Sequence, residues 1–321
     1  MLNTVFFGTP GVAVPFLERL AKKSRVIGVV SSPDRPAGRG YAVRPTEVKQ
    51  AAGALGLPVH QPEKLAGFSL EKVFGEKPDV GLVVAYGHLI PPSVFSEPKH
   101  GLVNAHFSLV PKYRGAAPMQ WALIRGEKET GVSLFQIDKG LDTGPVFLQG
   151  RYAIAPEDNA ATLRDHLVPL GLELLEEFLR RLEEGPWTPT IQGGDATVAP
   201  LLTKEEGRIR WGQQSAAEIV NLIRGTYEWP GAYGVVNGQR IKIRKAERVL
   251  RGTGAPGDIT AVEKGRGFLV KCLSDSLCVL RVQPEGKKEM DALSFWNGAR
   301  LSVGDRFVEQ ESLKGESHGI P

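Results

Sequence analysis

The architecture of the first half of the chain can be inferred from Gly101-Leu102-Val103-Asn104-Ala105-His106 and the runs around it. The apolar entry before Asn104 predicts a short buried strand, so Asn104 and His106, two residues apart, project from one side of it. Comparable apolar runs alternate with helical patterns, at residues 4–7, 12–22, 25–30, 46–55 and 80–85. Such alternation predicts an α/β fold built on a doubly wound, Rossmann-like parallel sheet.

The first strand-to-helix turn, Gly8-Thr9-Pro10-Gly11, lacks the third glycine of the G-x-G-x-x-G pattern. A nicotinamide or flavin site is therefore not expected. Ligands of open sheets gather at the carboxyl ends of the strands, which is where His106 falls.

A third polar residue is expected beside Asn104 and His106. The strand-like run 130–137 ends in the Gly-rich turn 138–144, which would carry Asp142 back toward the same pocket. An amide, an imidazole and a carboxylate would then converge. This set suits direct acyl transfer to a nucleophile that the substrate brings, with Asn104 donating to the carbonyl oxygen and His106 stabilising the charge that develops there. Asp142 would orient the imidazole and assist proton removal.

Other chemistries are poorly supported by the sequence. Ser108 does not lie in a G-x-S-x-G elbow, so an acyl-enzyme is not favoured. The six histidines show neither H-x-x-x-H nor H-E-x-x-H spacing, and no metal site is expected. Cys272 and Cys278 flank a predicted hairpin turn, could face one another across two strands, and are most simply buried thiols.

The whole string resembles the 10-formyltetrahydrofolate-dependent formyltransferases, whose pattern is N-x-H, then S-L-L-P-x-Y-R-G, then D-x-G-x-D-T-G. Here Val110 replaces the second Leu, and Phe107 stands where the family usually has a small residue. The resemblance implies that Asn104, His106 and Asp142 are catalytic and that 10-formyltetrahydrofolate is the formyl donor, without a metal. By the same resemblance the folate-binding positions are Ser108, Leu109, Val110, Pro111, Tyr86, Gly87, Leu89 and Ile90.

Within that family the chain looks most like the members that formylate methionyl initiator tRNA. The opening run 5–15, the loop 34–40 and the segment 207–233 carry this narrower match, which covers nearly the full length. The loop resembles one that grips the tRNA acceptor stem, although Tyr41-Ala42 stands where the family usually has lysines. Arg35, Arg39 and Arg44 are the cations left in it to meet phosphates.

A second domain is expected after an extended linker. We place the formyltransferase domain at 1–184, the Pro- and Gly-rich linker at 185–204, an OB-like β-barrel for tRNA at 205–310 and a polar tail at 311–321. Residues 204–310 hold 18 Lys and Arg against 13 Asp and Glu. Asn237-Gly238 predicts a hairpin turn, and the strand after it alternates isoleucines with the cations Arg240, Lys242 and Arg244, a face suited to phosphates or simply to solvent.

The composition agrees with the prediction of two domains. At 321 residues the chain is long enough for two domains, and a hydrophobic content of 41% with 24% charged residues is typical of a soluble globular protein. No apolar run approaches the roughly 20 residues of a membrane span, and the amino terminus reads as a strand and not as a signal peptide. We expect a cytoplasmic monomer that does not associate with membranes.

Two alternatives stay open. One is formyl transfer to another amine, such as an amino sugar nucleotide or a purine-pathway glycinamide, which would use the same three residues. The other is a tRNA-binding protein whose folate site has lost activity. Folate binding without turnover would be its signature.

Overall fold

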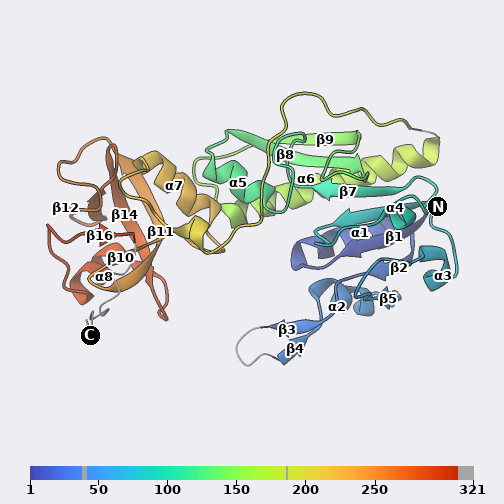
Figure 1. Cartoon of the computed structure of the whole chain (residues 1–321), viewed down its shortest axis with the longest axis horizontal. Coiled ribbons are helices and arrows are strands. Elements are labelled where there is room, and N and C mark those ends of the chain that lie inside the picture. Colours follow the sequence, from blue (N-terminus) through green and yellow to red (C-terminus); the bar gives the residue numbers. More distant parts are fainter. Residues whose placement is uncertain (38–41, 186, 310–321) are drawn as a thin grey trace, which may run out of the picture. The chain divides into compact units, whose positions relative to one another are not determined.

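The computed structural model of the chain describes residues 1–37, 42–185 and 187–309. They form two compact units (Figure 1). The first unit holds Met1–Met119, Lys128–Ile154 and Leu163–Leu201, and the second holds Gln120–Glu127, Ala155–Thr162 and the described residues from Leu202 on.

The first unit is built on a seven-stranded sheet whose order is β5-β2-β1-β6-β7-β8-β9. The five strands from β5 to β7 run parallel, and β8 and β9 are antiparallel additions at one edge. The chain moves outward from β1 to β2 and β5 and then returns to β6, so strand order reverses at β1. The strands are β1 (Asn3–Gly8), β2 (Arg25–Val30), β5 (Val59–His60), β6 (Val80–Val84), β7 (Leu102–His106), β8 (Glu129–Gln136) and β9 (Val146–Ala153).

Helices follow the strands as the alternation predicts. The helix α1 (Val14–Lys23) buries Phe16, Leu17 and Leu20, because apolar residues at this spacing share one helix face. The helix α2 (Glu47–Ala54) begins at Thr46, whose hydroxyl accepts from the amide of Lys49. The other helices assigned wholly or partly to this unit are α3 (Leu70–Phe74), α4 (Pro92–Phe95), α5 (Pro118–Ile124) and α6 (Ala160–Glu184).

Pro169 does not divide α6, although a proline inside a helix removes one backbone hydrogen bond. The residues on both sides of it are buried, among them Leu163, Leu167, Leu175 and Phe178. Burial of a large apolar side chain contributes about 1.5–3 kcal/mol, so four of them outweigh the roughly 3 kcal/mol that proline costs. A proline at this position predicts a kink or a break, and the helix shows no break.

The first unit includes a small hairpin between β2 and α2. Its strands are β3 (Arg35–Ala37) and β4 (Ala42–Arg44), with Arg35 directly opposite Arg44. Asp34, at its base, accepts from Gln61 and is ion-paired with Lys49. These two hydrogen bonds lower the pKa of the Asp34 carboxyl. The predicted phosphate contact Arg39 lies outside the described residues.

The second unit is a curled antiparallel sheet with the order β12-β13-β14-β11-β10-β16, to which β15 adds beside β14. Its core includes Trp211, Phe268, Phe307 and the isoleucines of β11. The fold class expected from the sequence, a Rossmann-like sheet domain followed by a smaller barrel-like β-domain, is confirmed. The elements are α7 (Ala216–Gly225), β10 (Tyr233–Val236), β11 (Gln239–Val249), β12 (Ile259–Glu263), β13 (Gly267–Lys271), β14 (Ser276–Pro284), β15 (Met290–Asp291), α8 (Ala292–Gly298) and β16 (Phe307–Val308).

The two cysteines do not face one another. The register pairs Lys271 with Ser276 and Leu269 with Cys278. The residue opposite Cys278 is therefore Leu269, three residues before Cys272 in the chain. Both thiols are free and buried. Burial raises the pKa of Cys272 to about 12.

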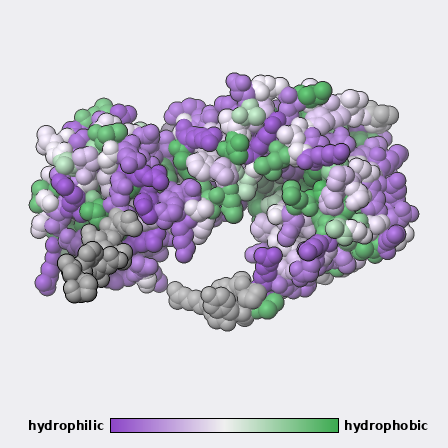
Figure 2. All heavy atoms as spheres, in the orientation of Figure 1, coloured by the Kyte–Doolittle hydropathy of each residue, from purple (hydrophilic) through white to green (hydrophobic). Residues whose placement is uncertain are grey.

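Figure 2 shows hydrophilic residues over much of the visible face of each unit, with hydrophobic residues exposed in small groups. No helix in the described part of the chain is long and apolar enough to cross a membrane.

Candidate active site

The strand β7 places the first two candidate residues. Asn104 pairs with Val83 of β6 and Phe135 of β8, and His106 pairs with Ser133 of β8. Side chains alternate along a strand, so Asn104 and His106 project from the same side of the sheet. Asn104 is partly buried and His106 is 6% exposed.

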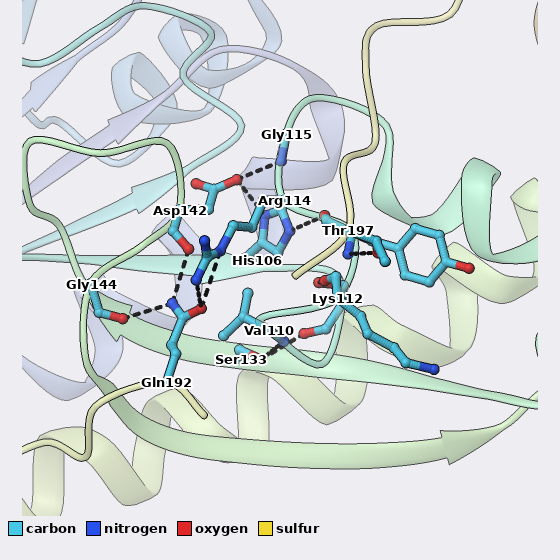
Figure 3. Close-up of polar contacts among 12 residues, drawn as sticks. His106, Val110, Lys112, Arg114, Gly115, Ser133, Asp142, Gly144, Gln192 and Thr197 are labelled. Atoms are coloured by element: carbon cyan, nitrogen blue, oxygen red, sulfur yellow. Dashed lines mark hydrogen bonds and ion pairs between the residues drawn. The ribbon is translucent and has the colours of Figure 1, made fainter. Parts of the chain in front are cut away.

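The imidazole of His106 is held by the backbone. Its Nε2 lies 2.9 Å from the carbonyl oxygen of Tyr113, and its ring packs edge-on against Phe135. A carbonyl only accepts, so Nε2 carries a hydrogen and donates it to Tyr113. The second ring nitrogen, Nδ1, is thereby turned toward Asp142 (Figure 3).

Asp142 lies in the turn after β8, as the sequence predicts. Its Oδ2 is 3.6 Å from His106 Nδ1 and accepts from the amide of Gly115 at 2.7 Å. The distance to His106 is longer than a direct hydrogen bond. The direct hydrogen bond of the imidazole is therefore the one to the Tyr113 carbonyl. Asp142 places a carboxylate beside the other ring nitrogen of His106, Nδ1. The carboxylate is 14% exposed.

The turn that carries Asp142 is fixed from within by Asp138. Its Oδ1 accepts from the amide of Gly140 at 2.9 Å and from the hydroxyl of Thr143 at 2.6 Å. Gly144 closes the turn where a Cβ atom would lie 1.7 Å from the carbonyl oxygen of Gln136. Only glycine permits this approach.

The predicted folate loop, Ser108 to Pro111, is hydrogen-bonded to β8, and its residues Ser108 and Val110 are buried. The hydroxyl of Ser133 accepts from the Val110 amide at 3.2 Å and donates to the Ser108 carbonyl at 2.6 Å. Gln149 of β9 donates to the Val110 carbonyl and to Ser133, each at 2.9 Å. The Ser108 hydroxyl is itself used within the loop, because it donates to the Lys112 carbonyl at 2.7 Å.

A cavity of about 650 Å³ opens at the carboxyl ends of β1, β2 and β6, where strand order reverses. Its lining includes Tyr86 and Gly87 from the predicted folate positions and Arg35 and Arg44 from the hairpin. Burial raises the pKa of Tyr86 to about 12, so its hydroxyl stays neutral. None of the three predicted catalytic residues is part of this lining, so the cavity does not enclose them.

The two other predicted folate positions on this loop differ in exposure. Leu89 is 91% exposed and borders a smaller cavity of about 210 Å³, whereas Ile90 packs against the core of the first unit. In the described residues, no group of three or more His, Cys, Asp and Glu side chains is arranged to hold a metal ion.

The cations of β11 alternate with buried isoleucines, as predicted, but they are not simply solvated. The Arg240 guanidinium lies 3.6 Å from the centroid of the Tyr233 ring. Arg244 stacks on Tyr227 at 4.0 Å and is 15% exposed. Arg244 also has an acidic partner, Glu289 at 3.4 Å. Lys242 has a lowered pKa because of burial and of the neighbouring cations Arg244 and Arg240.

The segment expected to be a linker is hydrogen-bonded to the candidate site. Thr197 accepts from the amides of Tyr113 and Arg114, each at 2.9 Å, and the Ala199 amide donates to the Arg114 carbonyl at 2.7 Å. Gln192 reaches both Arg114 and the Asp142 turn. These residues could not be predicted from the sequence, because a stretch rich in Pro and Gly gives no periodic signal.

The sheet order with its reversal at β1 is that of doubly wound α/β proteins, which bind ligands at the carboxyl ends of their strands. The family model for formyl transferase matches residues 2–179, and the model for the formyl transferase C-terminal domain matches residues 201–300. The chain therefore belongs to the formyl transferase family.

Its relatives narrow the class. Methionyl-tRNA formyltransferase of Thermodesulfovibrio yellowstonii is 45% identical over 302 residues, which cover 94% of this chain and 97% of the relative. The protein of the same name from Geobacter metallireducens is 44% identical and covers 95% and 98%. Within the family the chain groups with these methionyl-tRNA formyltransferases.

A solved structure shares the fold at much lower identity. The N-formyltransferase from Helicobacter canadensis, in complex with folinic acid and dTDP-3-aminofucose, superposes with a TM-score of 0.65 at 20% identity. The match covers 88% of this chain and 100% of that one. At this identity the likeness concerns the fold alone.

Proposed function

We propose that this chain transfers the formyl group of 10-formyltetrahydrofolate to the α-amino group of methionyl initiator tRNA. The observation that carries the proposal is the match to methionyl-tRNA formyltransferases across both units. The initiator tRNA and the folate are then the partners, and the cytoplasm, where translation begins, is the compartment.

The proposed catalytic residues are Asn104, His106 and Asp142. The free α-amino group titrates near 8, so an appreciable neutral fraction exists at pH 7 and no strong base is required. The amine attacks the formyl carbon, a C–N bond forms, and negative charge develops on the formyl oxygen. Asn104 donates a hydrogen bond to that oxygen, since preorganised donors act most strongly on charge that appears in the transition state. His106, whose Nε2 hydrogen is donated to the Tyr113 carbonyl and whose Nδ1 faces Asp142, is proposed to stabilise the same charge through the dipole of its ring.

Proton transfer completes the reaction. The attacking amine loses a proton as the bond between the formyl carbon and folate N10 breaks, and N10 gains one. Asp142, with its carboxylate beside His106 Nδ1, would assist this transfer. The formyl donor is proposed to contact the loop Ser108 to Pro111 and the loop that holds Tyr86, Gly87, Leu89 and Ile90.

The proposed tRNA contacts lie on both units. Arg35 and Arg44 are exposed at the stem of the hairpin, and Arg39 belongs to the same proposal although it lies outside the described residues. Arg240, Lys242 and Arg244 form the second set. Phosphate contacts of this kind make affinity fall as salt rises.

Replacement of Asp142 by Asn tests the catalytic assignment. A positioned acid or base contributes roughly 100-fold to 10,000-fold, so D142N should lower kcat within that range. Affinity for the tRNA should stay within about twofold of wild type, because the change removes one charge and no predicted RNA contact. Equal losses in kcat and in tRNA affinity would contradict the assigned role.

One rival acceptor, an amino sugar nucleotide, would use the same three residues. The shared fold with an enzyme crystallised with such a nucleotide does not favour it over methionyl-tRNA, because at 20% identity that likeness concerns the fold alone. Formylation of a small amine in preference to methionyl-tRNA would establish this alternative.

A further inference from the structure

We propose that Gln192, paired with Arg114, is a positioning residue for Asp142: it clamps the turn that presents the carboxylate to His106. The inference rests on the proposed function, in which Asp142 takes part in formyl transfer. Gln192 lies in the Pro- and Gly-rich segment after α6 and is partly buried.

The side-chain amide of Gln192 is fully engaged (Figure 3). Its Nε2 donates to the Asp142 carbonyl at 2.9 Å and to the Gly144 carbonyl at 2.7 Å. Its Oε1 accepts from Arg114 Nη2 at 2.7 Å and from Nε at 3.3 Å. One side chain thus spans the Asp142 turn and the loop after β7.

Those two loops are joined a second time by the carboxylate itself. The amide of Gly115, the residue after Arg114, donates to Asp142 Oδ2 at 2.7 Å. The contacts therefore form a closed ring that runs from Asp142 through Gln192 and Arg114 to Gly115 and back. Gly115 has a φ of +121°, and a Cβ there would lie 2.6 Å from the Ala199 carbonyl oxygen, so this part of the ring has little freedom.

Asp142 needs external support because of its backbone. Its φ is +53°, in the left-handed region that residues other than glycine adopt uncommonly, although Asp and Asn do so more often than the rest. A residue in this region persists only where its surroundings fix it. Asp138 holds Gly140 and Thr143 within the turn, whereas Gln192 holds the carbonyl groups of Asp142 and Gly144.

Gln192 can act as an anchor because its own segment is fixed on both sides. Thr190 and Val146 exchange two backbone hydrogen bonds, of 2.7 and 2.8 Å. On the other side Thr197 accepts from the Arg114 amide at 2.9 Å. The glutamine is therefore held in place at both ends before it reaches the turn.

The test uses two variants at one position, an exposed control and a double-mutant cycle. Q192A removes every contact of the amide. Q192E keeps an acceptor for Arg114 but places a second acceptor against the carbonyls of Asp142 and Gly144. Q213A replaces an exposed glutamine of the second unit and should behave as wild type.

We expect Q192A to lower kcat for formyl transfer at least tenfold, and Q192E by no less, because a small displacement of a catalytic group is enough for such a loss. KM for both substrates should stay within about threefold. In the D142N background the same Q192A change should lower kcat less than about twofold, because the group that it positions is already gone. A structural role alone would give equal losses in both backgrounds.

A second readout does not depend on activity. Amide hydrogen exchange of a peptide covering residues 138–144 should be about tenfold faster in Q192A than in wild type, with peptides from β1 and β6 unchanged. Additive kcat losses, or unchanged exchange at 138–144, would overturn the positioning role. A wild-type protein without formyl transfer would refute the proposed function instead, and the exchange result would still decide whether Gln192 holds the turn.

Discussion

The hydroxyl of Ser133 allows a stability prediction at the candidate folate loop. Ser133 is fully buried, and its hydroxyl serves the Val110 amide at 3.2 Å and the Ser108 carbonyl at 2.6 Å. In S133A both backbone groups lose their partner away from water. Gln149 keeps its second acceptor, the Val110 carbonyl at 2.9 Å, and is less affected.

The magnitude follows from these two orphaned groups. A buried polar group left without a partner costs about 1–3 kcal/mol, so the loss of two partners in S133A should lower the free energy of unfolding of the first unit by about 2–6 kcal/mol. Ser93 is exposed on α4 and provides a matched control, since S93A should change this free energy by less than about 0.5 kcal/mol. KM for the formyl donor should rise in S133A, because the loosened loop is the one proposed to bind it.

The assay must report on one unit, because a chain with two units does not have a single unfolding transition. Native-state hydrogen exchange of peptides from β1 and β6 reads the core of the first unit alone. If S133A and S93A gave the same exchange and the same donor KM, the hydrogen-bonded loop would not have the role that the structure assigns to it.

Three further results are expected. G144A forces the Asp142 turn away from the Gln136 carbonyl, so kcat should fall by about 100-fold in steady-state assays; an active G144A enzyme would contradict the tight turn. Burial and the neighbouring cations lower the pKa of Lys242, so it loses its charge below the pH of about 10.4 at which an ordinary lysine does, and tRNA binding should weaken as pH rises toward that value. K242R, which stays charged, should flatten that dependence in a filter-binding titration, and parallel curves would argue against a contact there. Cys272 and Cys278 are buried, so a thiol reagent at pH 8 should label neither in the native protein and both in urea; rapid native labelling would contradict their burial.

Local pattern was enough to predict the arrangement around β7. Asn104 and His106 share a side because strand side chains alternate, and the strand itself follows from its apolar entry. The Gly-rich turn after β8 predicts that Asp142 returns to the same region, which the 3.6 Å approach to His106 agrees with. The alternation of β11 likewise predicts its two faces, with Ile241 and Ile243 buried.

Long-range partners could not be predicted in this way. Gln192 is 50 residues from Asp142 and 78 from Arg114 in the chain, and nothing local distinguishes it from an exposed linker residue. The Tyr113 carbonyl that holds His106 is a backbone group, so no residue type indicates it. At Pro169 a local signal predicts the wrong result. The cost of a proline within a helix is outweighed there by the burial of apolar residues of α6 before and after it.

The most direct test of the account is formyl transfer from 10-formyltetrahydrofolate to methionyl initiator tRNA. Free methionine, elongator methionyl-tRNA and amino sugar nucleotides would be offered as competing acceptors under identical conditions. Selective formylation of the initiator, reduced by roughly 100-fold to 10,000-fold in D142N, is the predicted result. Transfer to a small amine alone would contradict the proposed tRNA function. The catalytic roles of Asn104, His106 and Asp142 would remain compatible with that result, because the rival acceptor would use the same residues.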